Sequence, residues 1–569
     1  MTSSRPAQEL PPRIPQPRHR HGAPSGPWPF LDLDSEIDLS LFSNPPARSP
    51  TEEQRHWSKY PQSLYPNWTP SQQAKSGITD VVGHIEGRCL IHNVHVLNTG
   101  VFTSEEDHVV TALDAEEYWN KLHEDLPSNV TVRALFVDSL SGPVLQMLGA
   151  RFNIEPFFFS SSFNWIPARY QDTVGEGDHI TMTLSFIRSM QNPTAIPSSP
   201  TSDYPPTIPT LNSEDQVIDT QAPLLLSSSN HVLTHDILSI HMVRSRGLST
   251  IISYHPPHQH RTTTAHTLRT RLLAAGQSVY WNKIFTPTIS TDPTFVLLAL
   301  LWYPLYAFDE SLDALYSHIC WLEGRVIATT EMTTLSQQLY VVRAHLLHYA
   351  ALLEDFRKAV VFVSETRNPM LEHPADDVSE ETIASMKEYM RRESKNLLDE
   401  IARLEENRKM QDNRLKNVMD LAFSSVNLED SRTMKNLTEA AVRDSAAMKQ
   451  VAYLTMFFLP ASFAAAVFGM NVDILTQDAR GSLAHYFAFA VPLTAVTVWI
   501  IMAFQFRKRD PHNLIHDENY VPFWSKLSWP LVSVRKKIIR SKTIQRNSVR
   551  LISRPGSTGV DPTPLPMWD

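Results

Sequence analysis

Cysteine is scarce in this sequence, because only Cys89 and Cys320 occur among 569 residues, far apart and outside any CxxC pair. A disulfide framework or a cysteine-based zinc site is therefore not expected, and the soluble parts are expected to face a reducing compartment. The motifs GxSxG, GxxxxGK[ST] and HExxH are also missing. Since these motifs carry common hydrolytic and nucleotide-dependent chemistry, an enzyme is not expected.

Positive charge is scarce in the first 450 residues, which hold a surplus of 15 acidic side chains. The tail after Phe506 has the opposite sign, with 12 Lys/Arg against five Asp/Glu. An acidic body argues against nucleic acid as a partner and favours cations. The basic run at 535–550 is expected either to contact anionic lipid or to remain a solvated tail.

Residues 1–72 lack hydrophobic periodicity and hold 14 of the 41 prolines. We predict that the Pro-rich segment 1–79 is disordered. There is no apolar h-region, so a secretory signal peptide is not expected. Interleaved prolines also argue against the amphipathic helix of a mitochondrial presequence.

From about residue 80 the pattern becomes globular, with the apolar segments GHIEGRCLIHNVHVL, TVRALFVDSL, HITMTLSFI and LSTIISYH, of which ITMTLSFI alternates with period two. These read as strands between helical patterns and predict an α/β (α+β) cytosolic domain over 80–365. A Pro/Ser/Thr-rich stretch at about 193–223 predicts a disordered insertion. The uncharged run at 294–308 is only fifteen residues long, so a buried core helix is favoured over a membrane span.

A third kind of pattern starts at 376, where acidic residues and Ser379 provide N-cap chemistry for a helix. Apolar residues then recur at intervals of seven positions, and Arg408 and Gln411 interrupt this heptad pattern. The apolar positions are Ile383, Met390, Leu397, Ile401, Leu404, Leu415, Val418 and Ala422. This imperfect heptad predicts a stalk helix over 376–450 that runs on to a membrane, with an amphipathic helix packed on its own domain as the alternative.

Two long uncharged runs follow, and they predict transmembrane helices at 451–471 and 483–506. The short loop 472–482 between them puts both termini on one side. Lys and Arg flank the spans on the side of the body and of the tail 507–569, so the positive-inside rule places both in the cytosol. A multi-pass plasma-membrane protein is expected, rather than a mitochondrial inner-membrane one.

One stripe of the first span is mostly small or hydroxylated, at spacings of three or four. Its members are Ser445, Met448, Ala452, Thr455, Leu459, Ser462, Ala466 and Gly469. Small residues allow close helix packing, and hydroxyls along a pore would face passing ions, so the stripe alone leaves both interpretations open. Two spans cannot enclose a pore, and several copies would be required.

The tripeptide Gly469-Met470-Asn471 closes this span, and the segment DSAAMKQVAYLTMFFLPASFAAAVFGMN resembles the first span of the CorA-type magnesium transporter family. The segments VRALFVDSLSGPVLQMLG and FNWIPARY resemble fungal members. The resemblance implies a CorA-like homopentameric funnel, in which a stalk helix continues into the pore-lining span. It places a hydrophobic gate at Met448, Val451 and Leu459, a polar ring at Ser462, and a selectivity filter at the tripeptide.

This filter suits Mg²⁺, which keeps an octahedral shell of oxygens and sheds water reluctantly. Asn471 carbonyls could hydrogen-bond the hydrated ion, Gly469 would permit a tight turn, and Asp473 and Asp478 would raise the local cation concentration. Relatives often carry asparagine at the position of Ser445, so Co²⁺, Ni²⁺ or Mn²⁺ could also pass. No cofactor is expected beyond Mg²⁺ as the transported and regulatory ion, and the residues of a regulatory metal site are not assigned.

Two alternatives remain open at this stage. A membrane-anchored coiled-coil scaffold with little conductance would keep the same architecture without needing Asn471. The histidines of SYHPPHQHRTTTAH (His255, His258, His260 and His266) could ligate a metal, although the surrounding prolines and threonines favour an irregular loop.

Overall fold

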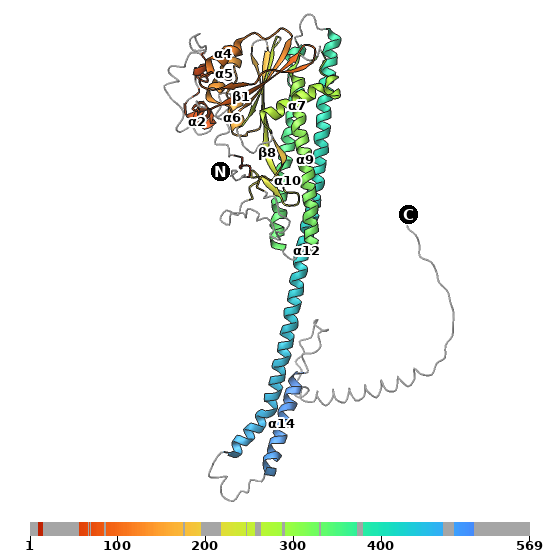
Figure 1. The fold of residues 1–569 in the computed structure, drawn as a ribbon. Helices are drawn as coiled ribbons and strands as arrows, with labels where there is room; N and C mark the ends of the chain where they lie inside the picture. The colour runs from red at the N-terminus through yellow and green to blue at the C-terminus, as the bar shows by residue number, and fades with distance from the viewer. Residues whose placement is uncertain are drawn as a thin grey trace, which may run out of the picture. The chain divides into compact units, whose positions relative to one another are not determined.

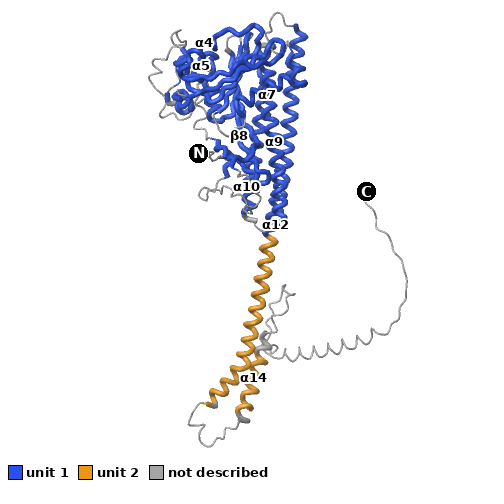
Figure 2. Tube along the Cα trace, viewed as in Figure 1, with its two compact units in different colours: residues 1–426 blue, residues 427–569 orange. Residues whose placement is uncertain are grey.

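A computed structural model describes the chain in fourteen stretches. They are residues 10–14, 56–66, 68, 70–84, 87–174, 177–194, 218–245, 247–256, 263–286, 289, 291–328, 332–372, 379–469 and 483–505. The chain divides into two compact units, residues 1–426 and 427–569 (Figure 2). The division falls at residue 426, within a long helix and well beyond the predicted domain end at 365.

The first unit contains one mixed sheet of nine described strands. The strands are β1 (Cys89–Leu97), β2 (Phe102–Ser104), β3 (His108–Val110), β4 (Val130–Asp138), β5 (Ala168–Val174), β6 (Gly177–Gln191), β7 (Leu224–Leu226), β8 (His231–Arg244) and β9 (Ser249–His255). Their order is β2-β1-β4-β9-β8-β6-β5, with β3 on β1 and β7 on β8. Neighbours are antiparallel except β4 and β9, which are parallel. The α/β class expected from the sequence is confirmed.

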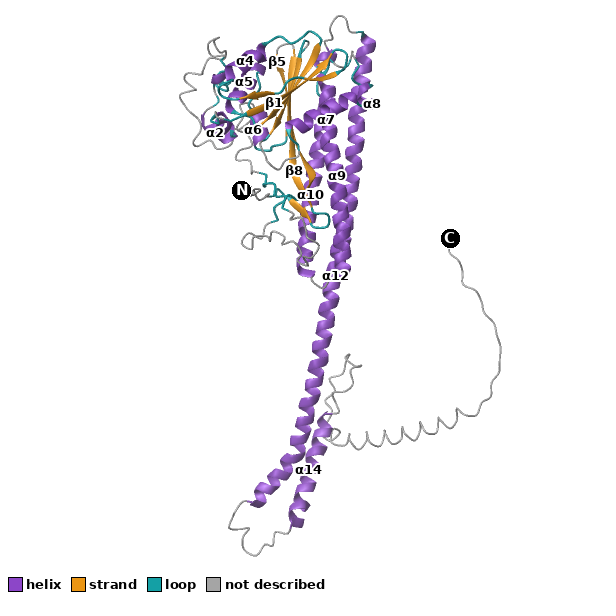
Figure 3. Ribbon diagram, viewed as in Figure 1, coloured by secondary structure: helices purple, strands orange, loops and turns teal. Residues whose placement is uncertain are grey.

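Helices cover both faces of this sheet (Figures 1 and 3). The described helices are η3 (Trp57–Lys59), α2 (Pro70–Ser76), α3 (Ile78–Val82), α4 (Ala115–His123), α5 (Gly142–Phe152), α6 (Phe157–Phe163), α7 (Ala265–Gln277), α8 (Val279–Asn282), α9 (Pro293–Ala328), α10 (Met332–Glu365), α11 (Pro369–Glu372), α12 (Glu380–Gly469) and α14 (Leu483–Gln505). Short helices pack on one face and the longer α7, α9 and α10 on the other. The sheet is therefore the middle of three layers.

Alternation along β4 shows how the sequence divides the core between these layers. Val132, Ala134 and Phe136 join the cluster of the long helices, whereas Leu135 and Val137 join the cluster of the short ones. Successive side chains of a strand point to opposite faces, so an uninterrupted apolar run serves both.

The N-terminal segment differs from the expectation of disorder over 1–79. Residues 56–66, 68 and 70–84 are described, and Tyr60 and Trp68 are buried against the short-helix face. The hydroxyl of Tyr60 donates to the carbonyl of Ile154 at 2.8 Å, and its ring occupies the space where a Cβ on Gly149 would stand. Aromatic anchors outweigh the prolines here, because each buries a large apolar area.

The predicted insertion at about 193–223 lies mostly outside the described residues. Its last residues are described, and Arg13 forms an ion pair with Asp219 there. The backbone N–H of Ile14 donates to the carbonyl of Gln221 at 3.3 Å. Segments of the predicted N-terminal and internal disorder are thus paired with each other.

Helix α9 contains the uncharged run at 294–308. Its most apolar 18-residue stretch has a mean hydropathy of 1.3, which is enough to cross a membrane. However, 67% of that stretch is buried inside the protein. Phe295, Leu301 and Phe308 belong to the main core. The prediction of a buried core helix is confirmed.

Helix α12 begins as predicted, with the Ser379 hydroxyl accepting the backbone N–H of Thr382 at 3.2 Å. Its 90 residues run without a break to Gly469, so one helix joins the stalk and the first span. The first half is not a free stalk, however. The heptad residues Leu397, Ile401, Leu404, Leu415, Val418 and Ala422 are buried in the core with α9 and α10. The alternative of a helix packed on its own domain is correct up to residue 426.

Gln411 and Arg408, which interrupt the heptad, are buried against α9 and α10 and form hydrogen bonds to them. Gln411 donates to the carbonyl of Leu312 on α9 at 2.8 Å, and Arg408 approaches the carbonyl of Leu346 on α10 at 3.4 Å. Both residues therefore satisfy backbone acceptors in the core.

His318 provides a pH-sensitive element of this core. Its Nδ1 lies 3.0 Å from the hydroxyl of Ser228, its ring stacks on Trp321, and burial lowers the pKa of the imidazole to about 4. The folded unit favours the neutral ring, so the contribution to stability is present above pH 6.5 and is lost as pH falls towards 4. At pH 5 the loss should be about 2 kcal/mol.

We therefore expect His318→Gln to lose less unfolding free energy than the wild type between pH 7.5 and pH 5. Urea unfolding of the full chain in detergent, followed by tryptophan fluorescence, measures this difference. Equal losses in the two proteins would contradict a role for His318.

Candidate functional site

The second unit contains the end of α12 and helix α14. The apolar window of α12 has a mean hydropathy of 1.5, and only 11% of it is buried inside the protein. Helix α14 contains a shorter apolar helical segment, Tyr486–Ile500. Since a helix satisfies its own backbone polar groups, exposed apolar helices of this kind suit a lipid environment.

One side of α12 packs against α14 through small or compact residues. Pro460 and Ala464, four residues apart, are buried, as is Ala490 on α14. The hydroxyl of Tyr486 donates to the carbonyl of Ala461 at 3.1 Å. Small residues allow membrane helices to approach closely, so this pair of helices forms a hairpin. The sequence analysis did not single out Pro460 and Ala464, although their spacing of four residues brings both to one side of the helix.

The predicted pore stripe lies away from that contact. All eight members, from Ser445 to Gly469, are exposed in the single chain, and Met448 and Leu459 are 75% and 69% exposed. The structure therefore places the stripe together on one face of α12, and α14 does not cover it. The small residues that pack the hairpin are a separate set.

The hydroxyls of the stripe have a defined arrangement. Thr455 donates to the carbonyl of Ala452 at 3.0 Å, and Ser462 donates to that of Leu459 at 2.9 Å. Each proton is thus used within the helix, while the hydroxyl oxygen keeps lone pairs directed away from it. Such oxygens can accept hydrogen bonds from the water shell of a cation.

Apolar side chains alternate with these hydroxyl positions along the helix. Met448 of the stripe and Val451 beside it precede Thr455, and Leu459 stands between Thr455 and Ser462. All three apolar side chains are more than half exposed. If several copies brought the stripe to a common axis, apolar rings would alternate with hydroxyl rings.

The predicted filter extends beyond the described residues. Gly469 is the last residue of α12, and a Cβ built on it would meet no described residue within 4 Å. Met470, Asn471, Asp473, Asp478, the rest of the loop and the basic run at 535–550 lie outside the described residues.

The histidine cluster considered as a metal site is only partly described. His255 ends β9, is buried and contacts the hydroxyl of Ser253 at 3.0 Å, whereas His266 is the second residue of α7 and lies beside His92. The other two histidines lie outside the described residues. In the described part of the chain, no three His, Cys, Asp or Glu residues are placed to hold a metal ion.

Comparison with known proteins finds one matching family model. Residues 258–508 match the family model of the CorA-like Mg²⁺ transporter protein, which covers the long helices of both units. No curated protein sequence matches the chain.

Solved structures of low identity also match. The complete structure of the CorA magnesium transporter from Methanocaldococcus jannaschii has 12% identity and a TM-score of 0.34, and the match covers 74% of this chain and 98% of that one. The full-length CmaX protein has 13% identity and a TM-score of 0.35, over 73% and 97% of the two chains. Over residues 258–508, the chain is similar to the CorA-like Mg²⁺ transporter protein family.

Proposed function

We propose that this protein is a membrane channel or transporter for divalent cations, with Mg²⁺ as its main substrate. The exposed polar stripe on α12 carries the proposal, because it lies within the family match and is left uncovered by the only other described helix of its unit. Ions would move down their electrochemical gradient through a pore lined by this stripe.

Several copies must combine to enclose such a pore, and we propose the homopentamer that the family resemblance implies. Each copy would contribute one α12, with α14 on the outer side. The hairpin contact between Pro460, Ala464 and Ala490 supports this arrangement, since it turns the opposite side of α12 towards the neighbours.

Met448, Val451 and Leu459 would form the gate. Apolar rings in a narrow pore exclude ions by dewetting until the helices move apart. The hydroxyl of Thr455, between these rings, and that of Ser462, beyond Leu459, would provide acceptors for the hydrated ion.

Selectivity would depend on residues 469–471, where a ring of Asn471 amide oxygens would hold the ion through its water shell. Asp473 and Asp478 would attract cations to the entrance. Ser445 leaves the cytosolic end of the pore with a hydroxyl instead of an amide, so Co²⁺, Ni²⁺ and Mn²⁺ would compete with Mg²⁺.

We further propose a plasma-membrane protein with both termini in the cytosol, on the basis of the basic residues that flank the spans. The run at 535–550 would contact anionic head groups. The acidic body would raise the cation concentration at the cytosolic mouth.

Flux into liposomes tests the function. Vesicles that contain the purified protein and a Mg²⁺-sensitive dye should fill under an inward gradient and a negative-inside potential, and Leu459→Ser should raise uptake at rest because it removes one apolar ring. Vesicles without protein give the background. If the oligomer forms but neither protein moves Mg²⁺, a non-conducting scaffold is the better description.

A further inference from the structure

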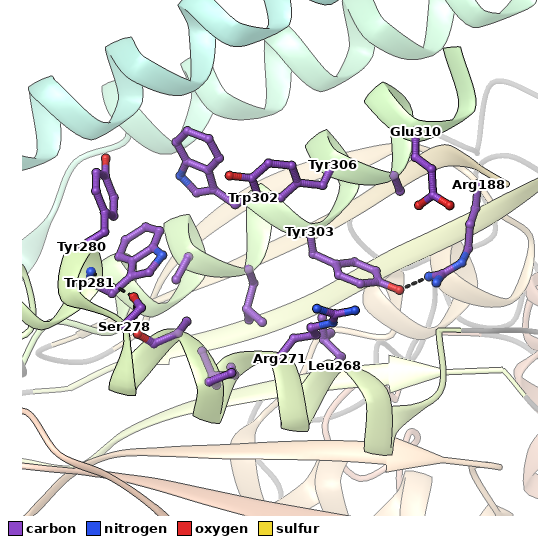
Figure 4. A pocket seen from close by; sticks show the side chains of 16 residues that line it. Arg188, Leu268, Arg271, Ser278, Tyr280, Trp281, Trp302, Tyr303, Tyr306 and Glu310 are labelled. Atoms are coloured by element: carbon purple, nitrogen blue, oxygen red, sulfur yellow. Dashed lines mark hydrogen bonds between the residues drawn. The ribbon is translucent and has the colours of Figure 1, made fainter. Parts of the chain in front are cut away.

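The first unit contains a cavity that the transport proposal does not use. Its volume is about 550 Å³, and it lies between α7, α8 and α9, with Arg188 of β6 at one end (Figure 4). This volume is typical of sites for small organic ligands. The cavity lies within the cytosolic unit.

Aromatic side chains make up much of the lining. They are Tyr280, Trp281, Trp302, Tyr303 and Tyr306, and they are accompanied by leucines and alanines of α7 and α9. Figure 4 shows Tyr280 and Trp281 at one end and Arg188 with Glu310 at the other, with Tyr303 and Arg271 between them. Flat apolar walls of this kind accommodate a planar ring by stacking or edge contacts.

The charged side chains of the lining have a net positive charge. They are the two arginines Arg188 and Arg271 and one carboxylate, Glu310. Neither arginine forms an ion pair among the described residues. Arg188 is held in place, because it donates to the hydroxyls of Thr263 at 2.7 Å and of Tyr303, and its guanidinium lies over the Tyr303 ring. A fixed guanidinium is suited to recognise a carboxylate or phosphate.

Two buried donors in this lining have no acceptor in the described part of the chain. They are the Nε–H of Arg188 and the indole Nε1–H of Trp302. An unpaired buried donor costs about 1–3 kcal/mol, so nearly all such groups in folded proteins are paired. Both atoms are also hidden from solvent, so a ligand would reach them only after neighbouring side chains move.

From these observations we infer that the cavity binds a planar aromatic molecule that carries an anionic group. The ring would lie among Trp281, Trp302 and Tyr303, and the anion would contact Arg188 and Arg271. A divalent cation does not fit this lining, because two arginines oppose one carboxylate. A nucleoside monophosphate and an aromatic carboxylate share the required chemistry.

The cavity is also connected to the long helix. The hydroxyl of Tyr280 donates to Glu393 of α12 and lies 3.3 Å from the side-chain nitrogen of Asn396. A ligand that contacts Tyr280 would therefore be two side chains away from the helix that continues into the span.

Calorimetric titration of the full chain in lipid nanodiscs tests the inference without depending on transport. The probes are AMP, adenosine and inorganic phosphate in one series, and 2-naphthoate with neutral 2-naphthalenemethanol in another. At least one aromatic anion should bind about tenfold or more tightly than its neutral counterpart. AMP binding alone would assign nucleotides, and 2-naphthoate binding alone would assign aromatic carboxylates. If neither anion binds, the inference is wrong.

Variants then locate the binding. Arg188→Gln and Arg271→Gln should each weaken the bound anion about tenfold. The second substitution changes an exposed side chain, so it should leave folding intact even if the first does not. Arg357→Gln, at an exposed arginine of α10 outside the cavity, is the matched control and should bind normally. Unchanged affinity in folded Arg271→Gln, or equal loss in the control, would overturn the assignment.

Discussion

Replacing Asn471 by alanine is expected to reduce Mg²⁺ uptake on the order of 100-fold while leaving the oligomer intact. Mg²⁺ gives up its water slowly, so a selective pore must recognise the hydrated ion by accepting hydrogen bonds from its shell. The asparagine amide provides a carbonyl acceptor in each copy, and alanine provides none. Hydrogen bonds to a charged partner contribute about 1.5–3 kcal/mol each, so the loss of even one or two accounts for this factor.

The measurement is dye-reported flux into liposomes, with the variant and the wild type reconstituted at equal density. Asn436→Ala is the matched control, because Asn436 is an exposed asparagine on α12 before the span. Size-exclusion profiles should be the same for all three proteins. If Asn471→Ala transports Mg²⁺ as fast as the wild type, the filter lies elsewhere on the stripe.

Much of this architecture follows from local patterns in the sequence. Four apolar segments predicted β1, β4, β6 and β9, and the clearest of them was the period-two alternation of β6, because a strand's hydrophobic pattern is a property of its own residues. The length and lack of charge of 294–308 correctly indicated a core helix. The small and hydroxylated stripe was visible for the same reason, since a helix brings every third or fourth residue to one face.

Other features depend on which strands or helices pack together, and a local sequence pattern does not identify the packing partner. The parallel pairing of β4 with β9 joins strands that are more than a hundred residues apart. The heptad of α12 has the same form whether its partner is α9 of the same chain or another copy of α12. Sequence therefore predicted the apolar face correctly and assigned too much of it to a free stalk.

Composition also misplaced the start of the ordered body. Proline content predicted disorder up to residue 79. The described residues between 56 and 84 are instead held on the sheet domain by the buried side chains of Tyr60 and Trp68. The cavity was not foreseen either. Its aromatic residues occur as the pairs at 280–281 and 302–303, but a cavity between three helices and a strand exists only after packing.

The largest expected effect on stability concerns Asp178 and Arg244, which form an ion pair with both side chains 1% exposed. Arg244 Nε donates to the Asp178 carboxylate at 2.6 Å, and its other nitrogens reach Thr294 on α9 at 3.2 Å and the carbonyl of Arg367 at 2.6 Å. Gln171 donates to the same carboxylate at 2.6 Å. The pair thus joins two strands to the start of α9 and the segment after α10.

Asp178→Ala should lower the unfolding free energy of the first unit by about 3–5 kcal/mol, because it leaves a buried guanidinium without its counter-ion. Removing the charge as well, in Asp178→Ala with Arg244→Met, should cost less than the sum of the single changes. Urea unfolding of the full chain in detergent provides the three values.

Glu354→Ala is the control for this cycle, since Glu354 pairs with Arg357 on the surface of α10 and should contribute less than about 1 kcal/mol. A loss as small as that in Asp178→Ala would mean that water reaches the pair when the carboxylate is removed. A double variant as unstable as the sum would show that Arg244 acts through Thr294 and Arg367 independently of Asp178. The expected coupling instead makes the pair one unit, which fixes β6 and β8 to the helices that lead into α12.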